Sequence, residues 1–432
     1  MSDTGERRHA GFKHRTRVAA AQDTLAELVP VLDRTETVPL EEADGRVIAT
    51  EVTADRNVPH YARAAMDGYA VRAADTFGAS DRSPTVVRIA ADEAGGPGEA
   101  VRVHTGSELP DGTNAVVMIE HVEELGGELE VYDAVAEGEN VGPIGEDIEA
   151  GRTLFEPGHQ LRPSDLGLLK SVDVREVPVR AEPEVAVIPT GEEVVQSDPT
   201  PGEVIETNGL TVSRLVERWG GSARYREVVT DDEERLRQAL ETDLDADILV
   251  TTGGSSVGAR DLTPDVVEEL GEVTIHGVAV KPGHPVALGH VADTPILLLP
   301  GYPVSCIVNA WLFLRPAIKW ALGTEVNAPP TVQARLDRKL RSEPGMRTLA
   351  RVQLERGDGG TDEVDREGER QDERDDEIDE ESDEWVATPV SASGAGVLST
   401  VALADGWVQI PESREGIPAG ETVAVEMWEA LP

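Results

Sequence analysis

The chain has 432 residues, of which 39% are hydrophobic, and a formal net charge of −44. A single hydrophobic core stops growing at about 250–300 residues, so this length predicts two to four domains. Such an excess of acid excludes nucleic acid as a partner, because the phosphates would be repelled. The single cysteine, Cys306, excludes an intrachain disulfide and a thiolate zinc site.

The distribution of apolar and basic residues indicates a cytoplasmic protein. No apolar run approaches the roughly 18–20 residues of a membrane helix, so we expect no membrane partner. The basic residues near the N-terminus precede no apolar segment, so residues 1–14 read as a flexible arm and not as a secretory signal. Lysine is scarce, and the lysines are Lys13, Lys170, Lys281, Lys319 and Lys339. An acid-rich, lysine-poor chain suits a halophilic cytoplasm, where the screening length falls to about 3 Å.

The first part of the chain predicts two different kinds of structure. Apolar residues recur at helical spacing from Val18 to Leu32, and an extended passage follows to residue 50. Between residues 51 and 139, short β-rich runs alternate with Gly, Pro and Asp turns, which predicts a small inserted β module. Residues 140–183, with the helix-like run Ser164–Leu169, are predicted to pack back on the first helix. They would form one linking and dimerisation domain with residues 15–50.

Residues 184–325 alternate between short apolar strands and helices. The predicted strands are Val185–Ile188, Val228–Val229, Asp247–Val250, Val278–Val280 and Ile296–Leu299. The predicted helices are Asn208–Trp219, Asp231–Leu240, one that begins with Thr263 as its cap, and Pro303–Leu322. This alternation is typical of a doubly wound parallel sheet, so the predicted fold class is multi-domain α/β.

Residues 326–432 again predict β structure and form the expected C-terminal β domain. The predicted strands are Val332–Leu336, Thr348–Leu354, Trp407–Ile410 and Thr422–Val425. Between them, residues 358–384 consist mainly of Asp and Glu. We expect this segment to be a disordered loop that keeps the chain solvated.

Glycine-rich loops follow three strands of the predicted α/β domain. They are Pro189–Glu193, Thr251–Gly258 and Pro300–Pro303. In open α/β sheets, ligands bind beyond the carboxyl ends of the strands. Backbone N–H groups and hydroxyls in such loops can cradle an anion, most simply a phosphate. One glycine pair would be an ordinary tight turn, whereas three loops at one edge favour a binding site.

Four charged residues lie close to these loops. Glu193, Asp232 and Asp261 offer the oxygen ligands that Mg²⁺ prefers, although each alone is typical of a solvated carboxylate in so acidic a chain. Lys281 directly follows a predicted strand in a chain that largely avoids lysine. Its compact cation would hold an oxyanion, and the alternative is a surface lysine at a turn.

Seven motifs in this order carry a family resemblance. They are Ala65–Val71, His104–Gly106, Gly145–Ile148, Thr190–Glu193, Thr252–Gly258, Lys281–Gly283 and Leu299–Ser305. Together the motifs resemble the molybdopterin molybdotransferase family, called MoeA in bacteria and represented in animals by the E domain of gephyrin. The resemblance covers residues 17–432 apart from the acidic segment.

The resemblance implies a four-domain homodimer that uses Mg²⁺ or a similar divalent ion. The implied reaction converts adenylated molybdopterin and molybdate into molybdenum cofactor and AMP, with a molybdopterin adenylyltransferase acting upstream. The family's site lies between the α/β domain of one subunit and the β module of the other. Asp67 and Thr105 would therefore belong with the strand-end loops of a partner chain.

The resemblance also implies roles for individual residues. The catalytic candidates are Asp67, Thr105, Glu193, Asp232, Asp261 and Lys281, and the metal ligands among them are Glu193, Asp232 and Asp261. The cofactor-binding candidates are Thr190, Gly191, Gly253, Gly254, Ser255, Ser256, His284, Pro300, Gly301, Arg347 and Arg351. For the two arginines, the alternative is an ordinary place on the surface of a strand.

Two residues depart from the family's pattern. His284 stands where lysine is common, which replaces a permanent cation with a group of ordinary pKa about 6.5. Tyr302 stands where bacterial members often have asparagine, so the mouth of the pocket would differ. These changes leave open whether the oxyanion is molybdate or tungstate.

Two alternatives to a molybdotransferase remain at the level of sequence. The first is a molybdopterin adenylyltransferase, because the α/β domain alone resembles that class as well. The second is a non-catalytic paralogue that only binds molybdopterin. The flanking domains and Met66–Tyr69 favour the transferase over the first, and the retained acids favour it over the second.

Overall fold

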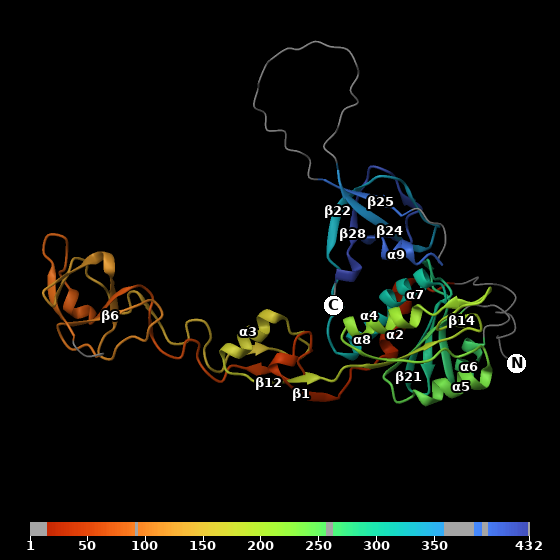
Figure 1. The fold of residues 1–432 in the computed structure, drawn as a ribbon, viewed down its shortest axis with the longest axis horizontal. Coiled ribbons are helices and arrows are strands. Elements are labelled where there is room, and N and C mark those ends of the chain that lie inside the picture. The colour runs from red at the N-terminus through yellow and green to blue at the C-terminus, as the bar shows by residue number, and fades with distance from the viewer. Residues whose placement is uncertain (1–14, 91–93, 256–261, 358–383, 391–395, 431–432) are drawn as a thin grey trace, which may run out of the picture. The chain divides into compact units, whose positions relative to one another are not determined.

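The computed structural model describes residues 15–90, 94–255, 262–357, 384–390 and 396–430. The described chain forms two compact units (Figure 1). One unit is Thr35–Val179, and the other combines Met1–Arg34 with Arg180–Pro432. The predicted acidic loop and N-terminal arm lie outside the described residues, apart from Glu384. None of the helices in the described ranges is long and apolar enough to cross a membrane.

A six-stranded sheet forms the centre of the larger unit. In spatial order its strands are β16 (Ser222–Tyr225), β13 (Glu184–Pro189), β17 (Ile248–Thr252), β21 (Thr294–Leu299), β20 (Ala287–Val291) and β18 (Gly271–His276). The first four run parallel, as the sequence predicted, whereas β20 is antiparallel to both of its neighbours, β21 and β18. The two-residue turn between Val291 and Thr294 explains this difference, because a hairpin can join only antiparallel strands. The fold class is therefore confirmed, with an antiparallel edge added to the sheet.

Helices cover both faces of this sheet (Figure 1). On one face lie α5 (Glu233–Thr242) and α6 (Thr263–Leu270), whose apolar residues share a core with the strands. On the other face lie α2 (Val18–Leu28), α4 (Asn208–Arg218), α7 (Pro303–Asn309) and α8 (Arg315–Ala321). A buried π-helical turn, Ala310–Leu314, joins α7 to α8, so the predicted helix Pro303–Leu322 is interrupted in its middle.

Three local predictions in this unit were wrong in detail. The edge strand is β16 and not Val228–Val229, although Val229 forms a single parallel bridge with Thr190. Thr263 begins α6 without capping it, because its hydroxyl finds no hydrogen-bond partner in the described chain. The third difference concerns α2, which packs against β20 and α8 within the larger unit.

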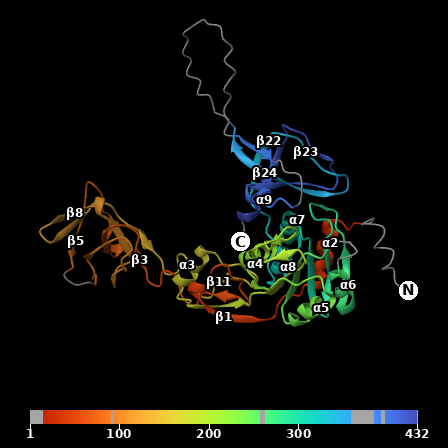
Figure 2. The same cartoon turned by 45° about the vertical axis from the view of Figure 1, so that its right-hand side comes forward.

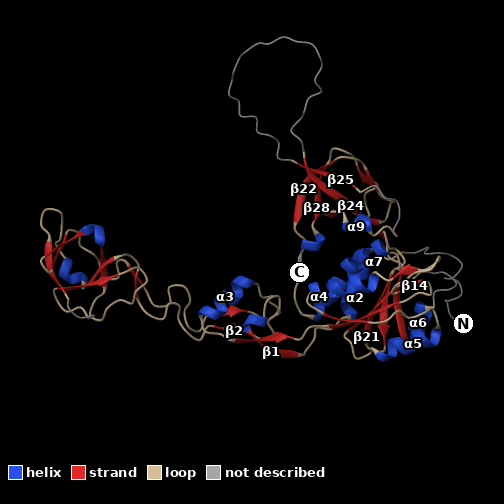
Figure 3. Cartoon of the chain, viewed as in Figure 1, coloured by secondary structure: helices blue, strands red, loops and turns tan. Residues whose placement is uncertain are grey.

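The C-terminal part of the unit is a small β-barrel (Figures 2 and 3). The ring contains β24 (Arg347–Arg356), β25 (Trp385–Pro389), β22 (Thr331–Leu336), β28 (Thr422–Glu426) and β26 (Gly406–Ile410), and a β24–β26 pairing closes it. A short pair, β23 (Leu340–Arg341) with β27 (Gly416–Ile417), and the helix α9 (Ser399–Ala402) complete this part.

One predicted strand of the α/β sheet belongs to this barrel instead. The strand is β19 (Val280–Lys281), which pairs in parallel with Arg347 and Thr348 of β24. The backbone of Ala279 explains the change, because it donates to Thr16 O and accepts from Arg347 N. This pairing carries Lys281 away from the α/β sheet and places it beside the barrel.

Four tryptophans join the barrel to the long helix. The ring of Trp311 lies 5.7 Å from that of Trp407 and 6.2 Å from that of Trp428, and 6.4 Å from that of Trp219. Trp407 and Trp428 are stacked at 4.7 Å with an angle of 9° between their planes. Aromatic pairs in these arrangements add stability beyond the apolar area that they bury.

The smaller unit contains the β module and the linking segment. The module is a six-stranded sheet in the order β7 (Ala115–Met118), β4 (Gly68–Val71), β6 (Glu99–Val103), β5 (Thr85–Ile89), β9 (Glu128–Val131) and β8 (Val122–Leu125). The linking segment pairs β1 (Thr35–Pro39) with β12 (Glu176–Arg180), β2 (Val52–Thr53) with β11 (Thr153–Phe155), and β3 (Arg63–Ala64) with β10 (Val141–Gly142). Residues from both ends of this unit, together with α3 (Pro163–Ser171), share one core.

Candidate functional site

The three strand-end loops of the α/β sheet are in backbone contact. A Cβ atom on Gly253 would lie 2.4 Å from the carbonyl oxygen of Thr190, and one on Gly301 would lie 3.6 Å from Gly253 Cα. Gly191 and Gly253 both have φ of 141°, which side-chain-bearing residues rarely adopt. The close approach of the β13 and β17 loops therefore requires glycine at position 253, whereas Gly301 of the β21 loop makes only an ordinary contact.

Two buried threonine hydroxyls face this edge without partners. Thr190 and Thr252 are 2% and 4% exposed, and within the described residues neither Oγ1 atom has a hydrogen-bond partner. Buried hydroxyls are nearly always satisfied, so an orphaned pair calls for an explanation. A ligand or an ordered water at the loops would supply the missing partner. Ser255 lies at the same edge and is also buried, whereas Ser256 lies outside the described residues.

Asn208 fixes the third loop. Its side-chain amide donates to the carbonyl oxygen of Gly301 at 2.7 Å. The adjacent Glu206 is buried and accepts hydrogen bonds from the Gly209 backbone at 2.6 Å and from the Tyr225 hydroxyl. Sequence reasoning missed Asn208, since a polar residue at the start of a helix is normally a cap.

The predicted metal ligands have separate roles in the structure. Asp232 accepts a hydrogen bond from Arg235 N at 3.0 Å and so caps α5. Burial raises the pKa of a neighbouring carboxyl group, that of Asp231, and the charges of Glu193 and Glu192 raise it further against a hydrogen bond from the Glu192 backbone. A carboxylate crowded by other carboxylates has the chemistry of a cation ligand.

The full predicted ligand set stays a prediction. Asp261 lies outside the described residues. Among the residues that are described, no group of three or more His, Cys, Asp or Glu side chains is arranged to hold a metal ion. The structure adds Asp231 as a neighbour of Glu193 that the sequence had not singled out.

A cavity of about 490 Å³ lies where β19 and α7 meet the barrel. It is lined by Lys281, Pro282, Gly283, His284, Pro285, Pro300, Tyr302, Ser305, Leu340, Thr348, Leu349, Ala350, Arg351, Pro389 and Val390. Four of the predicted site residues line it, namely Lys281, His284, Pro300 and Arg351. The cavity is therefore shared between a strand-end loop and a barrel strand, and its basic side chains come from β24 and from the segment that begins at β19.

The basic groups of this cavity differ in their surroundings. Lys281 Nζ lies 2.5 Å from Glu343 Oε1. Arg351 has a buried Nε atom with no partner in the described part of the chain, and burial lowers its pKa. Arg347, four residues earlier in the strand, instead contacts Glu412 at 3.3 Å and does not line the cavity. The two predicted arginines thus separate, and only Arg351 reaches the cavity.

His284 is a neutral imidazole at neutral pH. Burial lowers its pKa below the ordinary value of 6.5, and the charges of Arg15 and Lys281 lower it further, whereas Glu343 opposes them. The sequence suggested a cation that depends on pH. In the structure this side chain becomes charged only at a lower pH than an ordinary histidine would.

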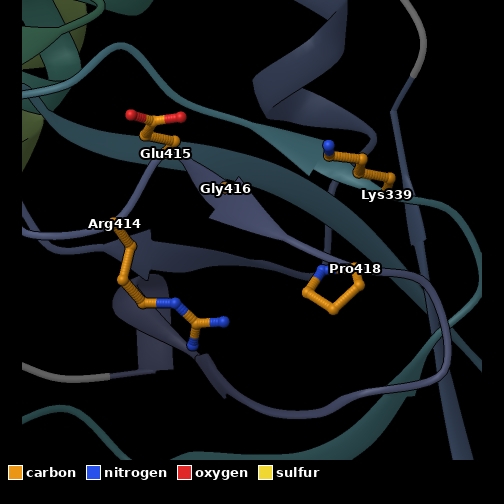
Figure 4. Close-up of a pocket in the computed structure, with 5 residues that line it drawn as sticks. All are labelled: Lys339, Arg414, Glu415, Gly416 and Pro418. Carbon is orange, nitrogen blue, oxygen red and sulfur yellow. The ribbon is translucent and has the colours of Figure 1, made fainter.

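A second cavity, of about 300 Å³, lies within the barrel part (Figure 4). It is lined by Lys339, Arg414, Glu415, Gly416 and Pro418. Arg414 is held by both oxygens of Glu421, at 2.8 and 3.0 Å. None of the predicted site residues lines this cavity.

Asp67 and Thr105 meet in the β module, as predicted for two members of one site. Asp67 Oδ1 accepts from the backbone N–H of Thr105 at 2.7 Å and from its hydroxyl at 2.8 Å. These two bonds lower the pKa of the Asp67 carboxyl, which is exposed. The adjacent Gly68 has no room for a side chain, because a Cβ atom would lie 2.0 Å from Val117 O. The module thus presents an ionised, oriented carboxylate at its surface.

Comparison with known families covers most of the chain. Residues 16–172 match the MoeA N-terminal region (domains I and II), residues 186–320 match a molybdopterin binding domain, and residues 377–428 match the MoeA C-terminal region (domain IV).

Individual proteins agree with these matches. A molybdopterin biosynthesis protein of Methanocaldococcus jannaschii is 33% identical, over 93% of this chain and 94% of its own length. The molybdopterin molybdenumtransferase of Bacillus subtilis is 30% identical, over 90% of this chain and 89% of its own length. The crystal structure of a molybdopterin biosynthesis MoeA protein from Pyrococcus horikoshii has a TM-score of 0.78 and 33% identity, with 96% of this chain and 99% of that chain covered.

Proposed function

This chain belongs to the MoeA family, and from that premise we propose that it is a molybdopterin molybdotransferase of molybdenum cofactor biosynthesis. Its substrates would be adenylated molybdopterin and molybdate, and its products molybdenum cofactor and AMP. The observation that carries this proposal is the edge where the three strand-end loops touch, with two unsatisfied hydroxyls beside them.

The strand-end loops would bind the nucleotide and pterin end of the substrate. The backbone N–H of Gly253 already donates to the carbonyl oxygen of Leu299 at 3.0 Å, so those of Gly254 and Ser255 would hold phosphate oxygens. The hydroxyls of Thr190 and Thr252 would gain the partners that they lack among the described residues. Asn208 would keep the Gly301 loop against this group through its hydrogen bond to the carbonyl. Holding the phosphoanhydride in one orientation is itself a source of rate enhancement.

The carboxylates beside the loops fit a divalent ion. Glu193 and Asp231 would hold it, with Asp232 and Asp261 as further candidates. When bound, the ion would offset the charge that builds on the departing phosphate.

The cavity beside the barrel would take the oxyanion. Lys281 and Arg351 provide two cationic side chains, and Ser305 and Thr348 line the same space with hydroxyls. Molybdate and tungstate have nearly the same size and charge, so both would fit these groups.

We further propose a homodimer whose active site is shared between subunits. The exposed Asp67 carboxylate, oriented by Thr105, would be supplied to the loops of a partner chain. The protein would act in the cytoplasm, downstream of an enzyme that adenylates molybdopterin.

Release of AMP from adenylated molybdopterin in the presence of molybdate and Mg²⁺ tests this function. We expect stoichiometric AMP and a cofactor that activates an apo-molybdoenzyme. Consumption of ATP with molybdopterin alone would instead identify an adenylyltransferase. Tight molybdopterin binding without AMP release by a folded protein would identify a binding paralogue.

A further inference from the structure

A carboxylate that does not itself line the cavity, Glu343, forms an ion pair with the cavity-lining Lys281. Glu343 Oε1 lies 2.5 Å from Lys281 Nζ, with the two side chains 59% and 53% exposed. The hydrogen bond from Lys281 is the main cause that lowers the pKa of Glu343, and the charge of Arg15 acts in the same direction. Glu343 is therefore the carboxylate toward which this basic cluster is turned.

Arg351 and His284 differ from Lys281 in their surroundings. Arg351 lines the same cavity with a buried Nε that meets no partner in the described ranges. His284 is neutral near pH 7, since burial and Arg15 lower its pKa. Lys281 thus lines the cavity and forms an ion pair with Glu343, which comes from the barrel side.

We propose that Glu343 is an internal counter-ion that occupies Lys281 until a doubly charged oxyanion displaces it. The inference rests on the proposed function, because it concerns the oxyanion of that reaction. Glu343 would set both the affinity and the charge selectivity of the cavity.

Coulomb's law gives the reason for charge selectivity. At equal distance a dianion interacts with Lys281 and Arg351 twice as strongly as a monoanion does. A dianion can therefore displace the single charge of Glu343. Chloride carries the same charge as the carboxylate but lacks its covalent tether, which keeps the carboxylate at a high effective concentration near Lys281. Chloride would thus be rejected while molybdate or tungstate is admitted.

The exposure of the Lys281–Glu343 ion pair sets the size of the effect on oxyanion affinity. Exposed ion pairs contribute little, so removal of Glu343 would tighten oxyanion binding by about two- to fivefold and not by orders of magnitude. Salt would weaken both the ion pair and the attraction of the anion, and high KCl would also supply the competing monoanion.

Titration of the full-length protein with sodium molybdate, followed by calorimetry at low and high KCl, tests the proposal. We expect Glu343→Gln to bind molybdate about two- to fivefold more tightly than wild type at low KCl. We also expect Glu343→Gln to lose more of its affinity as KCl rises, because chloride then reaches Lys281. Sodium tungstate should give the same pattern.

Two further variants separate this effect from general electrostatics. Glu421→Gln removes another ion-paired carboxylate of the barrel part, at 2.8 Å from Arg414, and should leave molybdate binding unchanged. In a Lys281→Met background, Glu343→Gln should have no effect, since the cation that Glu343 holds is gone. Equal tightening in that background, or by Glu421→Gln, would overturn the proposal.

The outcome also separates this inference from the proposed function. Wild type that releases AMP and binds molybdate, with Glu343→Gln no tighter and no more sensitive to KCl, would refute the counter-ion and leave the function standing. Absence of molybdate binding in both proteins, with folding confirmed by circular dichroism, would refute the counter-ion and the oxyanion cavity together. AMP release is measured in parallel for this reason.

Discussion

His284 is one of the two residues at which the sequence was expected to depart from the family's pattern. Burial and two neighbouring cations lower its pKa, so the imidazole is charged only under acidic conditions. Its contribution to anion binding should therefore appear as pH falls through a value below 6.5 and vanish above it.

A permanent cation at this position should remove that dependence. We expect His284→Lys to bind molybdate more tightly than wild type at pH 8, by about two- to tenfold, since a charge is added beside Lys281. The wild-type affinity should rise between pH 8 and pH 5.5, whereas that of the variant should stay level. Calorimetric titrations across this range provide the measurement. A variant that follows the same pH curve as wild type would show that His284 does not sense the anion.

Asp67 makes a second prediction at the scale of one residue. Its carboxylate is exposed and its contacts are local to Thr105, so the fold does not depend on it. We expect Asp67→Asn to slow AMP release by about 100-fold or more while the thermal midpoint stays unchanged. Asp81→Asn, an exposed aspartate of the same module, serves as the control. Nearly normal turnover by Asp67→Asn would remove this residue from the site.

The strand-end loops make a prediction at the scale of elements. A Cβ atom on Gly253 would lie 2.4 Å from Thr190 O at a φ of 141°, whereas one on Gly301 would make an ordinary contact of 3.6 Å. Gly253→Ala should force the loops apart and slow AMP release by about tenfold or more. Gly301→Ala on the same edge should retain most of the activity. Equal activity of the two variants would contradict the close approach of the loops.

Helix α8 contains a lysine whose charge opposes folding. Lys319 is 2% exposed, and burial lowers its pKa from 10.5 to about 8, with a further contribution from Arg315. Between pH 8 and pH 10.5 the unfolded chain keeps a proton that the folded chain has lost, so stability should rise with pH.

Replacement of Lys319 isolates this effect. In the wild type we expect the unfolding free energy to rise with pH by on the order of 2–3 kcal/mol at most. Lys319→Met should remove most of this rise. Lys339→Met, which removes an exposed lysine, should retain the wild-type slope. Urea unfolding at pH 7.5, 9 and 10 measures the difference. A slope that is unchanged in Lys319→Met would assign the pH dependence to another group.

The sequence predicted the helices and strands of this protein more reliably than it predicted which strands pair with one another. The strands β13, β17 and β21 followed from apolar runs, and the loops at their ends followed from glycine. The strand β19 was expected in the wrong sheet, because two residues before a proline carry no information on which neighbour they pair with. Thr263 was expected as a cap, yet only backbone geometry distinguishes a cap from the first helical residue.

The candidate site shows the same division. Asp67 and Thr105 were expected together and are hydrogen-bonded. Asp231 and Glu343 were missed, because a chain of net charge −44 has many acidic residues and only their neighbours in the folded protein distinguish them. Burial and long-range contacts decide which carboxylates are special, and neither is visible in a local pattern.

At the scale of the whole molecule, the proposal of a site shared between two subunits makes a quantitative prediction. In a dimer of one Asp67→Asn chain and one Lys281→Met chain, one site carries both substitutions and the other carries neither. After equal mixing, half of the dimers are mixed, so about one quarter of the wild-type AMP release should return. Subunit exchange is verified with a tagged chain. No recovery after verified exchange would contradict a site that combines Asp67 of one chain with Lys281 of the other.

The tryptophans at the contact between the barrel and the long helix provide an intrinsic spectroscopic signal for this contact. Trp407 and Trp428 stack at 4.7 Å and meet Trp311 at 5.7 and 6.2 Å, so the indoles of two structural parts form one chromophore cluster. Indoles this close exchange excitation energy, and their near-ultraviolet circular dichroism depends on mutual orientation. The cavity that contains Arg351 lies between the same two parts. Any shift of the barrel when an oxyanion enters would therefore change the tryptophan signal without an added dye.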